Sequence, residues 1–181
     1  MNKARLEAFT DAIVAIVVTI LVLELPKPET YTLAGLLANW QAYLVYIGTF
    51  VVLVGVWYQH HNLFDYAENI NRKVFWANAL WMLIQSFIPY VSAWMADFPD
   101  SRTPMMVFFV LNILWAASYR LLYYSLREIN DMPAYPWSRT LSYILILSIL
   151  LVISLWSIPA AMFGLIAFNV IGLIIGRDLE I

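Results

Sequence analysis

The stretch RLEAFTDAIVAIVVTILVL, residues 5–23, decides the fold class. Its ionisable side chains stand near its start, and residues 12–23 carry no charge. An α-helix needs about 20 mostly apolar residues to cross the hydrocarbon core of a bilayer. The stretch therefore predicts a transmembrane helix with charged side chains at one end.

The composition of the whole chain points to the same class. Of its 181 residues 63% are hydrophobic and 12% are charged, whereas soluble domains carry about 25% charged residues. We therefore expect an all-α integral membrane protein in the lipid bilayer. The net charge of −2 leaves no basic surface for a nucleic acid, and no soluble partner is evident.

Apolar runs long enough to cross the bilayer predict the topology of the chain. Secure spans lie near residues 4–25, 33–58, 74–95 and 105–126. The uncharged run 141–175 would measure about 50 Å as one helix, so it must fold back. Ser157-Ile158-Pro159 is the natural break, because proline suits the first turn of a helix but not its interior. The result is six transmembrane helices, the last two near 141–156 and 159–175, in a single domain over 1–181.

The basic residues divide unevenly between the two ends of these spans. The side of both termini carries Lys3, Arg5, Arg72, Lys73, Arg120, Arg127, Arg139 and Arg177, and the opposite side carries Lys27 and Arg102. The positive-inside rule then places both termini in the cytoplasm of a multi-pass cell-membrane protein. So strong a bias also disfavours an antiparallel dual-topology dimer.

The sequence offers no residues that would support an enzyme activity. The sequence contains no H-E-x-x-H, G-x-S-x-G, Walker or dinucleotide-binding motif. His60 and His61 are adjacent, so on a helix they point about 100° apart and cannot share one metal ion. Asp97 and Asp100 flank Pro99 in an expected loop without an apolar pocket, so we expect them to be solvated rather than a catalytic carboxylate pair. We expect no enzyme activity, no cofactor and no bound metal.

The first helix presents two different faces. Arg5 and Asp11 diverge by about 120° around the helix, so each needs a partner from another helix. Suitable polar residues are His60, His61 and Asn62 at the end of the second span and Asn78, next to Trp76, in the third. We expect a buried polar network joining the cytoplasmic ends of the first three helices. In the alternative, the Arg5 side chain extends to lipid phosphate.

The other face of the first helix is aliphatic. Ile16, Ile20 and Leu23 form a stripe together with Thr19. Such stripes usually face lipid or a protein core, but the flanking Ala8, Ala12 and Ala15 allow close approach of neighbouring helices. A symmetric ring of these helices would form a hydrophobic constriction that gates by dewetting.

Acidic residues predominate at the outer end of the expected spans. Glu24, Glu29, Asp97 and Asp100 outnumber Lys27 and Arg102 there. A negative surface concentrates cations at the mouth of a pathway. Glu24, directly after the apolar stripe, is the candidate residue of an outer mouth.

These residues resemble the transmembrane protein 175 potassium channels. The family signature R-x-x-x-F-S-D is matched by Arg5, Phe9 and Asp11, and Thr10 replaces its serine. The resemblance covers about twenty residues strongly and the rest of the chain through topology. It implies a homotetramer in which the first helix lines a cation pathway.

The resemblance also implies roles for individual residues. Rings at Ile16, Ile20 and Leu23, with Thr19 beside them, would be the narrowest points of the pathway. The signature residues Arg5, Phe9, Thr10 and Asp11 would be structural, supported by His61, Trp76 and Asn78, although His60 could take the place of His61.

No T-V-G-Y-G filter occurs, so an apolar neck would select potassium over sodium only modestly. We expect K⁺ as the permeating ion. One alternative is a secondary transporter or proton-coupled carrier, which would use an ionisable residue near the bilayer midplane. Another is a non-conducting membrane scaffold, which would show no ion flux in liposomes.

Overall fold

The computed structural model describes residues 2–132, 134 and 136–174. Every regular element among them is a helix, which confirms the all-α class. In chain order they are α1 (Lys3–Leu23), α2 (Leu33–Ala38), α3 (Trp40–Asp65), α4 (Arg72–Ser86), α5 (Ile88–Asp97), α6 (Arg102–Arg127), α7 (Trp137–Ser154) and α8 (Ile158–Ile174). Residue 175, the expected end of the last span, and Arg177 lie outside the described residues.

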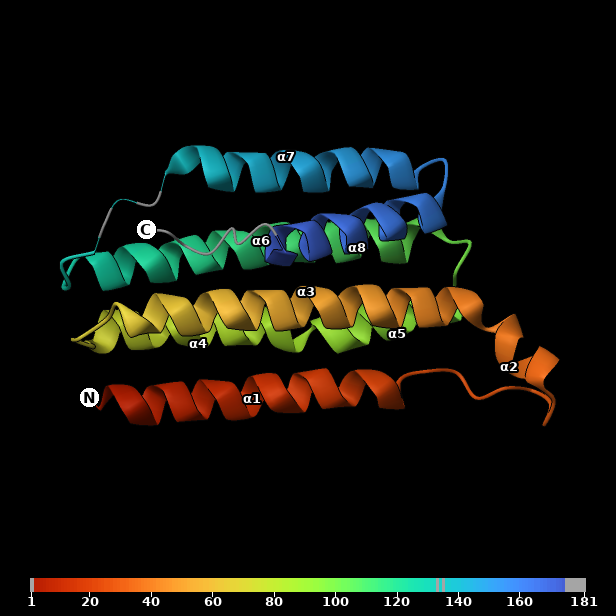
Figure 1. Cartoon of the computed structure of the whole chain (residues 1–181), viewed down its shortest axis with the longest axis horizontal. Helices are drawn as coiled ribbons and strands as arrows, with labels where there is room; N and C mark the ends of the chain where they lie inside the picture. Colours follow the sequence, from red (N-terminus) through yellow and green to blue (C-terminus); the bar gives the residue numbers. More distant parts are fainter. Residues whose placement is uncertain (1, 133, 135, 175–181) are drawn as a thin grey trace.

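The long helices form an elongated bundle in which successive spans run in opposite directions (Figure 1). In the described part of the chain, α1, α3, α6, α7 and the joined pair α4 and α5 are long and apolar enough to cross a membrane. Helix α8 is apolar but shorter. At about 1.5 Å per residue, α1 alone is roughly 30 Å long, which matches the hydrocarbon thickness.

Two of the expected spans differ from continuous helices. The run expected at 33–58 is divided, since α2 ends at Ala38 and α3 begins at Trp40. Between them the Asn39 amide donates to the Pro26 carbonyl at 3.4 Å, which ties α2 to the loop after α1. The third span bends at Phe87, between α4 and α5, because Pro89 has no N–H to continue the ladder.

The expected break after α7 is present. Helix α7 ends at Ser154 and α8 begins at Ile158, with Pro159 in its first turn. The Ser157 hydroxyl accepts a hydrogen bond from the Ala160 N–H at 3.3 Å, as a residue capping a helix start does. Helix α8 therefore returns against α7 and α3.

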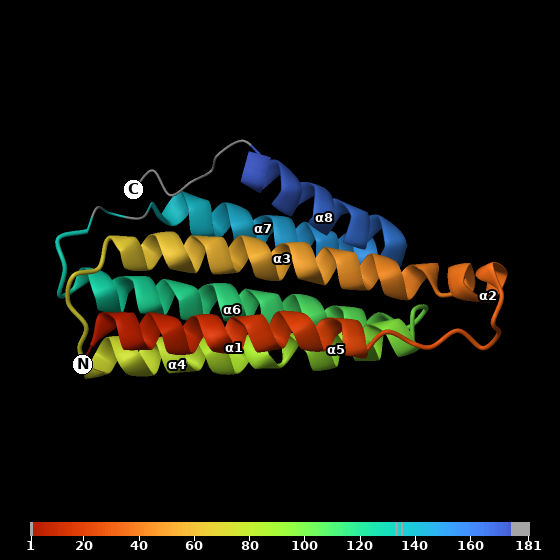
Figure 2. The same cartoon turned by 60° about the horizontal axis from the view of Figure 1, so that its bottom comes forward.

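Helices α4 and α6 form the most extensive helix pair, and α1, α3, α5, α7 and α8 also contribute side chains to the larger buried apolar cluster. Helix α1 lies along one edge of the bundle in Figure 1 and comes to the front in Figure 2, and it packs against α3, α4 and α5. The side chains that α1 buries are Leu6, Thr10, Val14, Val17 and Leu21. Its opposite face is left at the surface of the subunit, and the candidate site is built on these two faces.

Candidate functional site

The aliphatic stripe of α1 points away from the subunit. Ile16, Ile20 and Leu23 are 57%, 36% and 78% exposed, while Val14 and Val17 on the opposite face are 3% and 5% exposed. The chain buries one apolar face of α1 and exposes the other, although both are aliphatic. The exposed face is therefore available for contact with lipid, another copy of the chain, or a permeating ion.

Thr19 lies within the stripe but offers little polarity to it. Its hydroxyl is 2.9 Å from the Ala15 carbonyl and 2.9 Å from the Ile16 carbonyl of the same helix. A threonine hydroxyl bonded in this way keeps its proton within the helix and presents its methyl group to the neighbours. The exposed face is apolar over the two turns that Ile16, Thr19, Ile20 and Leu23 cover.

The buried face of α1 takes part in hydrogen bonds between three spans. Asn78 of α4 donates from Nδ2 to the Thr10 hydroxyl of α1 at 2.8 Å, and its Oδ1 lies 2.8 Å from Nε2 of His60 in α3. The Thr10 hydroxyl in turn donates to the Leu6 carbonyl at 2.9 Å. All three side chains are at most 2% exposed. Asn78 thus joins α1 and α3 through both ends of one amide.

A second bond ties α1 to α3. The indole Nε1 of Trp57 donates to Oδ1 of Asp11 at 2.9 Å. The bond gives the Asp11 carboxylate a partner near the end of the apolar run, where an unpaired charge is costly. Nothing in the spacing of Trp57 from Asp11 in the sequence revealed the contact.

Four residues expected in the network lie outside these bonds. Phe9 and Trp76 are 53% and 60% exposed, because they sit on the outward faces of α1 and α4. The side chain of His61 is 52% exposed and lies 3.8 Å from Asp65. Of the two adjacent histidines, the structure places His60 against Asn78, since the helical turn of about 100° carries His61 to the surface.

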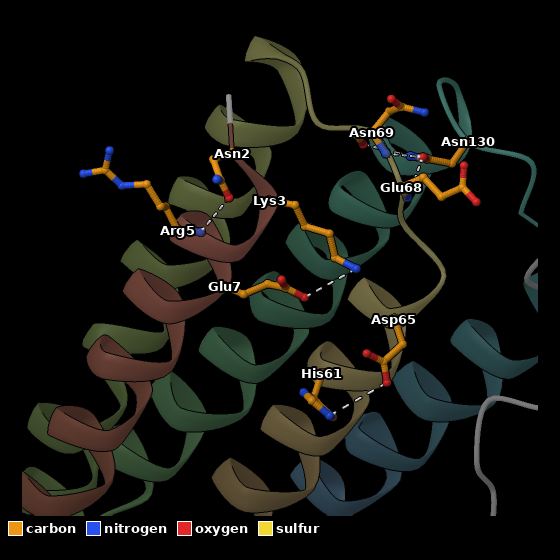
Figure 3. Close-up of polar contacts among 9 residues, drawn as sticks. All are labelled: Asn2, Lys3, Arg5, Glu7, His61, Asp65, Glu68, Asn69 and Asn130. Carbon is orange, nitrogen blue, oxygen red and sulfur yellow. Dashed lines mark hydrogen bonds and ion pairs between the residues drawn. The ribbon is translucent and has the colours of Figure 1, made fainter.

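Arg5 is the fourth of these residues. Its guanidinium extends away from the neighbouring polar groups (Figure 3), and no carboxylate of the described residues lies within ion-pair distance. Its backbone N–H is used, since Asn2 caps α1 by accepting from it at 3.3 Å. The structure therefore gives Arg5 no role inside the buried network of the subunit.

A polar clamp holds two loops at the N-terminal end of the bundle. Oδ1 of Asn130 accepts from the N–H groups of Glu68 and Asn69 at 3.0 and 2.7 Å (Figure 3). Its Nδ2 donates to the carbonyls of Asn69 and Leu126 at 3.1 and 2.9 Å. Lys73 and Glu128 form an ion pair beside it. The ends of α3 and α6 are fixed together near the buried network.

The opposite end of the bundle carries the acidic residues. Glu24 is exposed and caps α1, its N–H bonding to the carbonyls of Leu21 and Val22. Glu29, Asp97 and Asp100 are also exposed. Glu24 lines a small cleft between α1, α3 and α5. No group of three metal-ligating side chains occurs in the part of the chain that the structure describes.

Arg120 belongs to the basic residues that the sequence places on the side of both termini, but the structure buries its side chain. It is 5% exposed, and its guanidinium carbon lies 4.3 Å from the Trp137 ring centroid and 4.8 Å from that of Tyr124. Its Nη2 donates to the Tyr124 hydroxyl at 2.9 Å. The aromatic residues near Arg120 in the sequence were the available signal, since guanidinium groups favour aromatic faces.

Comparison with known proteins identifies relatives of this arrangement. The profile described as "Endosomal/lysosomal potassium channel TMEM175" matches residues 5–89. A protein of Chryseobacterium sp. (strain P1-3), named a potassium channel, is 34% identical over 122 residues, which cover 67% of this chain and 64% of that one. A potassium channel of Chamaesiphon minutus is 32% identical, over 67% of this chain and 70% of that one.

Vertebrate relatives match a smaller region. The human protein named endosomal/lysosomal proton channel TMEM175 is 30% identical over 101 residues, which cover 49% of this chain and 20% of that one. The chain thus matches just under two thirds of the Chryseobacterium protein and a fifth of the human one.

A solved structure shares the whole architecture. The crystal structure of a lysosomal potassium-selective channel TMEM175 homologue from Chamaesiphon minutus superposes with a TM-score of 0.79. The alignment covers 97% of this chain and 98% of that one, at 20% sequence identity. At this identity the likeness establishes the channel fold of the bundle.

Proposed function

Because the chain belongs to the TMEM175 family of membrane ion channels, we propose that it is a potassium-permeable cation channel whose pathway is lined by α1. The observation that carries the proposal is the division of α1 into two faces. The subunit packs Val14 and Val17 inward and leaves the equally apolar Ile16 and Leu23 exposed. In a bilayer an exposed aliphatic face contacts either lipid or another helix, and the small side chains of Ala8, Ala12 and Ala15 beside it favour close approach of neighbouring helices.

The proposed channel is a homotetramer built around α1. Four copies of the exposed face meet around one axis, and Ile16, Ile20 and Leu23 form successive apolar rings. Thr19 lies between them with its hydroxyl bonded inside its own helix. The neck then opposes ion passage through the cost of removing water rather than through carbonyl coordination. Such a device passes potassium over sodium only modestly, and no cofactor takes part.

The proposed orientation follows from the basic residues. The N-terminal end of the bundle, with Lys3, Arg5, Arg72 and Lys73, faces the cytoplasm of the cell membrane. Glu24 and the other acidic side chains then surround the outer mouth. Their charge raises the local concentration of K⁺ and lowers that of anions.

In the proposed tetramer, Arg5 and Phe9 lie where neighbouring subunits meet. Both lie on exposed α1 surface within one turn of each other, near the N-terminal end of the exposed face. In the tetramer they are available to neighbouring subunits, as is Trp76 on the outward face of α4. The contacts that the isolated subunit does not provide for Arg5 are then made between copies.

Two polar substitutions in the neck test the pathway. We expect Ile16→Asn and Leu23→Asn to wet the constriction and raise single-channel current severalfold in planar bilayers. The matched control is Leu145→Asn, the same change at a 60% exposed position of α7. Unchanged current in both neck variants, or an equal rise in the control, would move the pathway away from α1.

Selectivity gives a second reading on the same recordings. An apolar neck predicts a reversal potential that shows a modest preference for potassium over sodium. A sodium permeability about a hundredfold below that of potassium is what a carbonyl filter produces, and this result would contradict the proposed neck.

A further inference from the structure

Polar atoms lie buried and unpaired on α4 and α6, the two helices that pack most extensively against each other. They are Nε1 of Trp81, Oε1 and Nε2 of Gln85, Oδ1 of Asn112 and Nε1 of Trp115. The four side chains are between 0% and 2% exposed. Among the described residues, none of these atoms has a hydrogen-bond partner, although Nδ2 of Asn112 donates to the Phe108 carbonyl at 2.8 Å.

These side chains belong to one interface. Trp81 and Gln85 lie one turn apart on α4, and Asn112 and Trp115 lie three residues apart on α6. The rings of Trp81 and Trp115 are 5.9 Å apart between centroids, which fixes the two helices at a common depth. Because α4 and α6 run in opposite directions, Gln85 and Asn112 both lie one turn beyond this ring pair on the same side.

Polar atoms that are buried inside a membrane protein without a hydrogen-bond partner lower its stability. Each costs several kcal/mol in hydrocarbon, and folded proteins pair most of their buried polar groups with protein or ordered water. Four large side chains from two helices offer five such atoms together. An arrangement of this kind indicates an occupant with which they bond.

We propose that Gln85, Asn112, Trp81 and Trp115 form a buried hydration site in the middle of each subunit. The atoms comprise two carbonyl-type acceptors and three N–H donor groups, none of them charged. A neutral molecule that both donates and accepts satisfies such a set, and a buried water makes about three hydrogen bonds of this kind. A bare K⁺ would meet indole and amide N–H groups, and an anion would meet amide oxygens, so neither fits.

The site lies between two pairs of side chains that bond directly. The first pair is His60 of α3 and Asn78, which precedes the site along α4, and the His60 ring also stacks on Trp81 with centroids 4.5 Å apart. Seven residues after Gln85, Ser92 bonds to Thr49 at 3.1 Å. The α4 and α5 helices therefore carry polar groups at three depths inside the subunit, and the middle set is the one that takes water. This hydration is separate from the apolar face of α1.

Hydroxyl-radical footprinting of the unaltered protein in lipid nanodiscs tests the site. Radicals generated by X-rays from bound water oxidise side chains next to that water, even where bulk solvent has no access. We expect oxidation of Trp81 and Trp115 despite their burial. Tyr123, which is 1% exposed and lies in a separate buried cluster, is expected to stay protected under the same dose. Protection of both tryptophans while the 80% exposed Trp156 is oxidised would overturn the proposal.

A pair of substitutions makes the test specific. The double variant Gln85→Leu with Asn112→Leu removes three of the five atoms, and we expect oxidation of Trp81 and Trp115 to be lost. The control is Ser118→Ala, one turn from Trp115, which removes a buried hydroxyl already bonded to the Trp115 carbonyl at 2.7 Å. Undiminished oxidation in a folded double variant would contradict the assignment. If that variant does not fold, the oxidation of Trp81 and Trp115 in the unaltered protein still tests the proposal.

Discussion

The two faces of α1 use the same helix in opposite ways. The inward face carries Thr10, which is buried and bonded to Asn78, while the outward face carries Ile16 and Leu23, which are exposed. In a bilayer no water competes for polar groups, so a bonded asparagine holds helices together. Exposed aliphatic side chains add nothing to the stability of the single subunit. The contrast separates the face of α1 that packs into the helix bundle from the face that is left exposed.

Removal of Asn78 should have the largest effect on the inward face. Asn78→Leu breaks the bonds to Thr10 and His60, and the Nε2 atom of His60 is then buried without a partner. We expect the free energy of unfolding in mixed micelles to fall by about 2 kcal/mol. The control is Asn169→Leu in α8, whose amide donates to the Leu165 carbonyl of its own helix. An equal fall of the free energy of unfolding in the two variants would contradict the role of Asn78 in joining α1 and α3.

The adjacent histidines provide a smaller and closely matched test. His60→Leu removes one side of the Asn78 bond and a ring stacked on Trp81, so we expect a loss of about 1.5 kcal/mol. His61→Leu removes a mostly exposed ring near Asp65, and the expected change is below about 0.5 kcal/mol. Thermal denaturation of the two variants measures the difference. A reversed order would place His61 in the network.

The Trp57 bond should contribute least. Trp57→Phe keeps an aromatic ring but removes the N–H that Asp11 accepts at 2.9 Å. Because Asp11 is partly open to solvent, water or lipid headgroups replace the donor in part. We expect a loss of about 1 kcal/mol or less in unfolding free energy. Trp156→Phe, at an exposed position, should change it by less than half of that. A loss as large as that of Asn78→Leu would contradict this ranking.

The sequence predicted the helical class and the fold-back at Ser157-Ile158-Pro159, because these depend on local periodicity and on proline. Which of the two aliphatic faces of α1 is exposed depends on its packing against α3, α4 and α5. The bend at Phe87 was missed, although Pro89 was its signal. The division between α2 and α3 depends on a contact of Asn39 with Pro26, which spacing does not reveal.

The candidate site was predictable only in part. Asn78 follows from the need of buried polar groups for partners and Thr10 from the resemblance to the family signature, and the structure brings the two together. The choice between His60 and His61 depends on the rotation of α3 about its axis. A difference of one residue changes that rotation by about 100°, and the sequence does not determine it to within one residue. The partnership of Trp57 with Asp11 spans 46 positions and requires the packed structure.

Thiol accessibility tests most directly whether α1 lines the pathway. The sequence contains no cysteine, so Ile20→Cys introduces a single thiol on the exposed face, and Leu145→Cys introduces one on α7. The measurement is the potassium current before and after a charged, membrane-impermeant thiol reagent. The account predicts that the reagent abolishes most of the current of Ile20→Cys and leaves that of Leu145→Cys unchanged. A modified Ile20→Cys channel that conducts as before would contradict it.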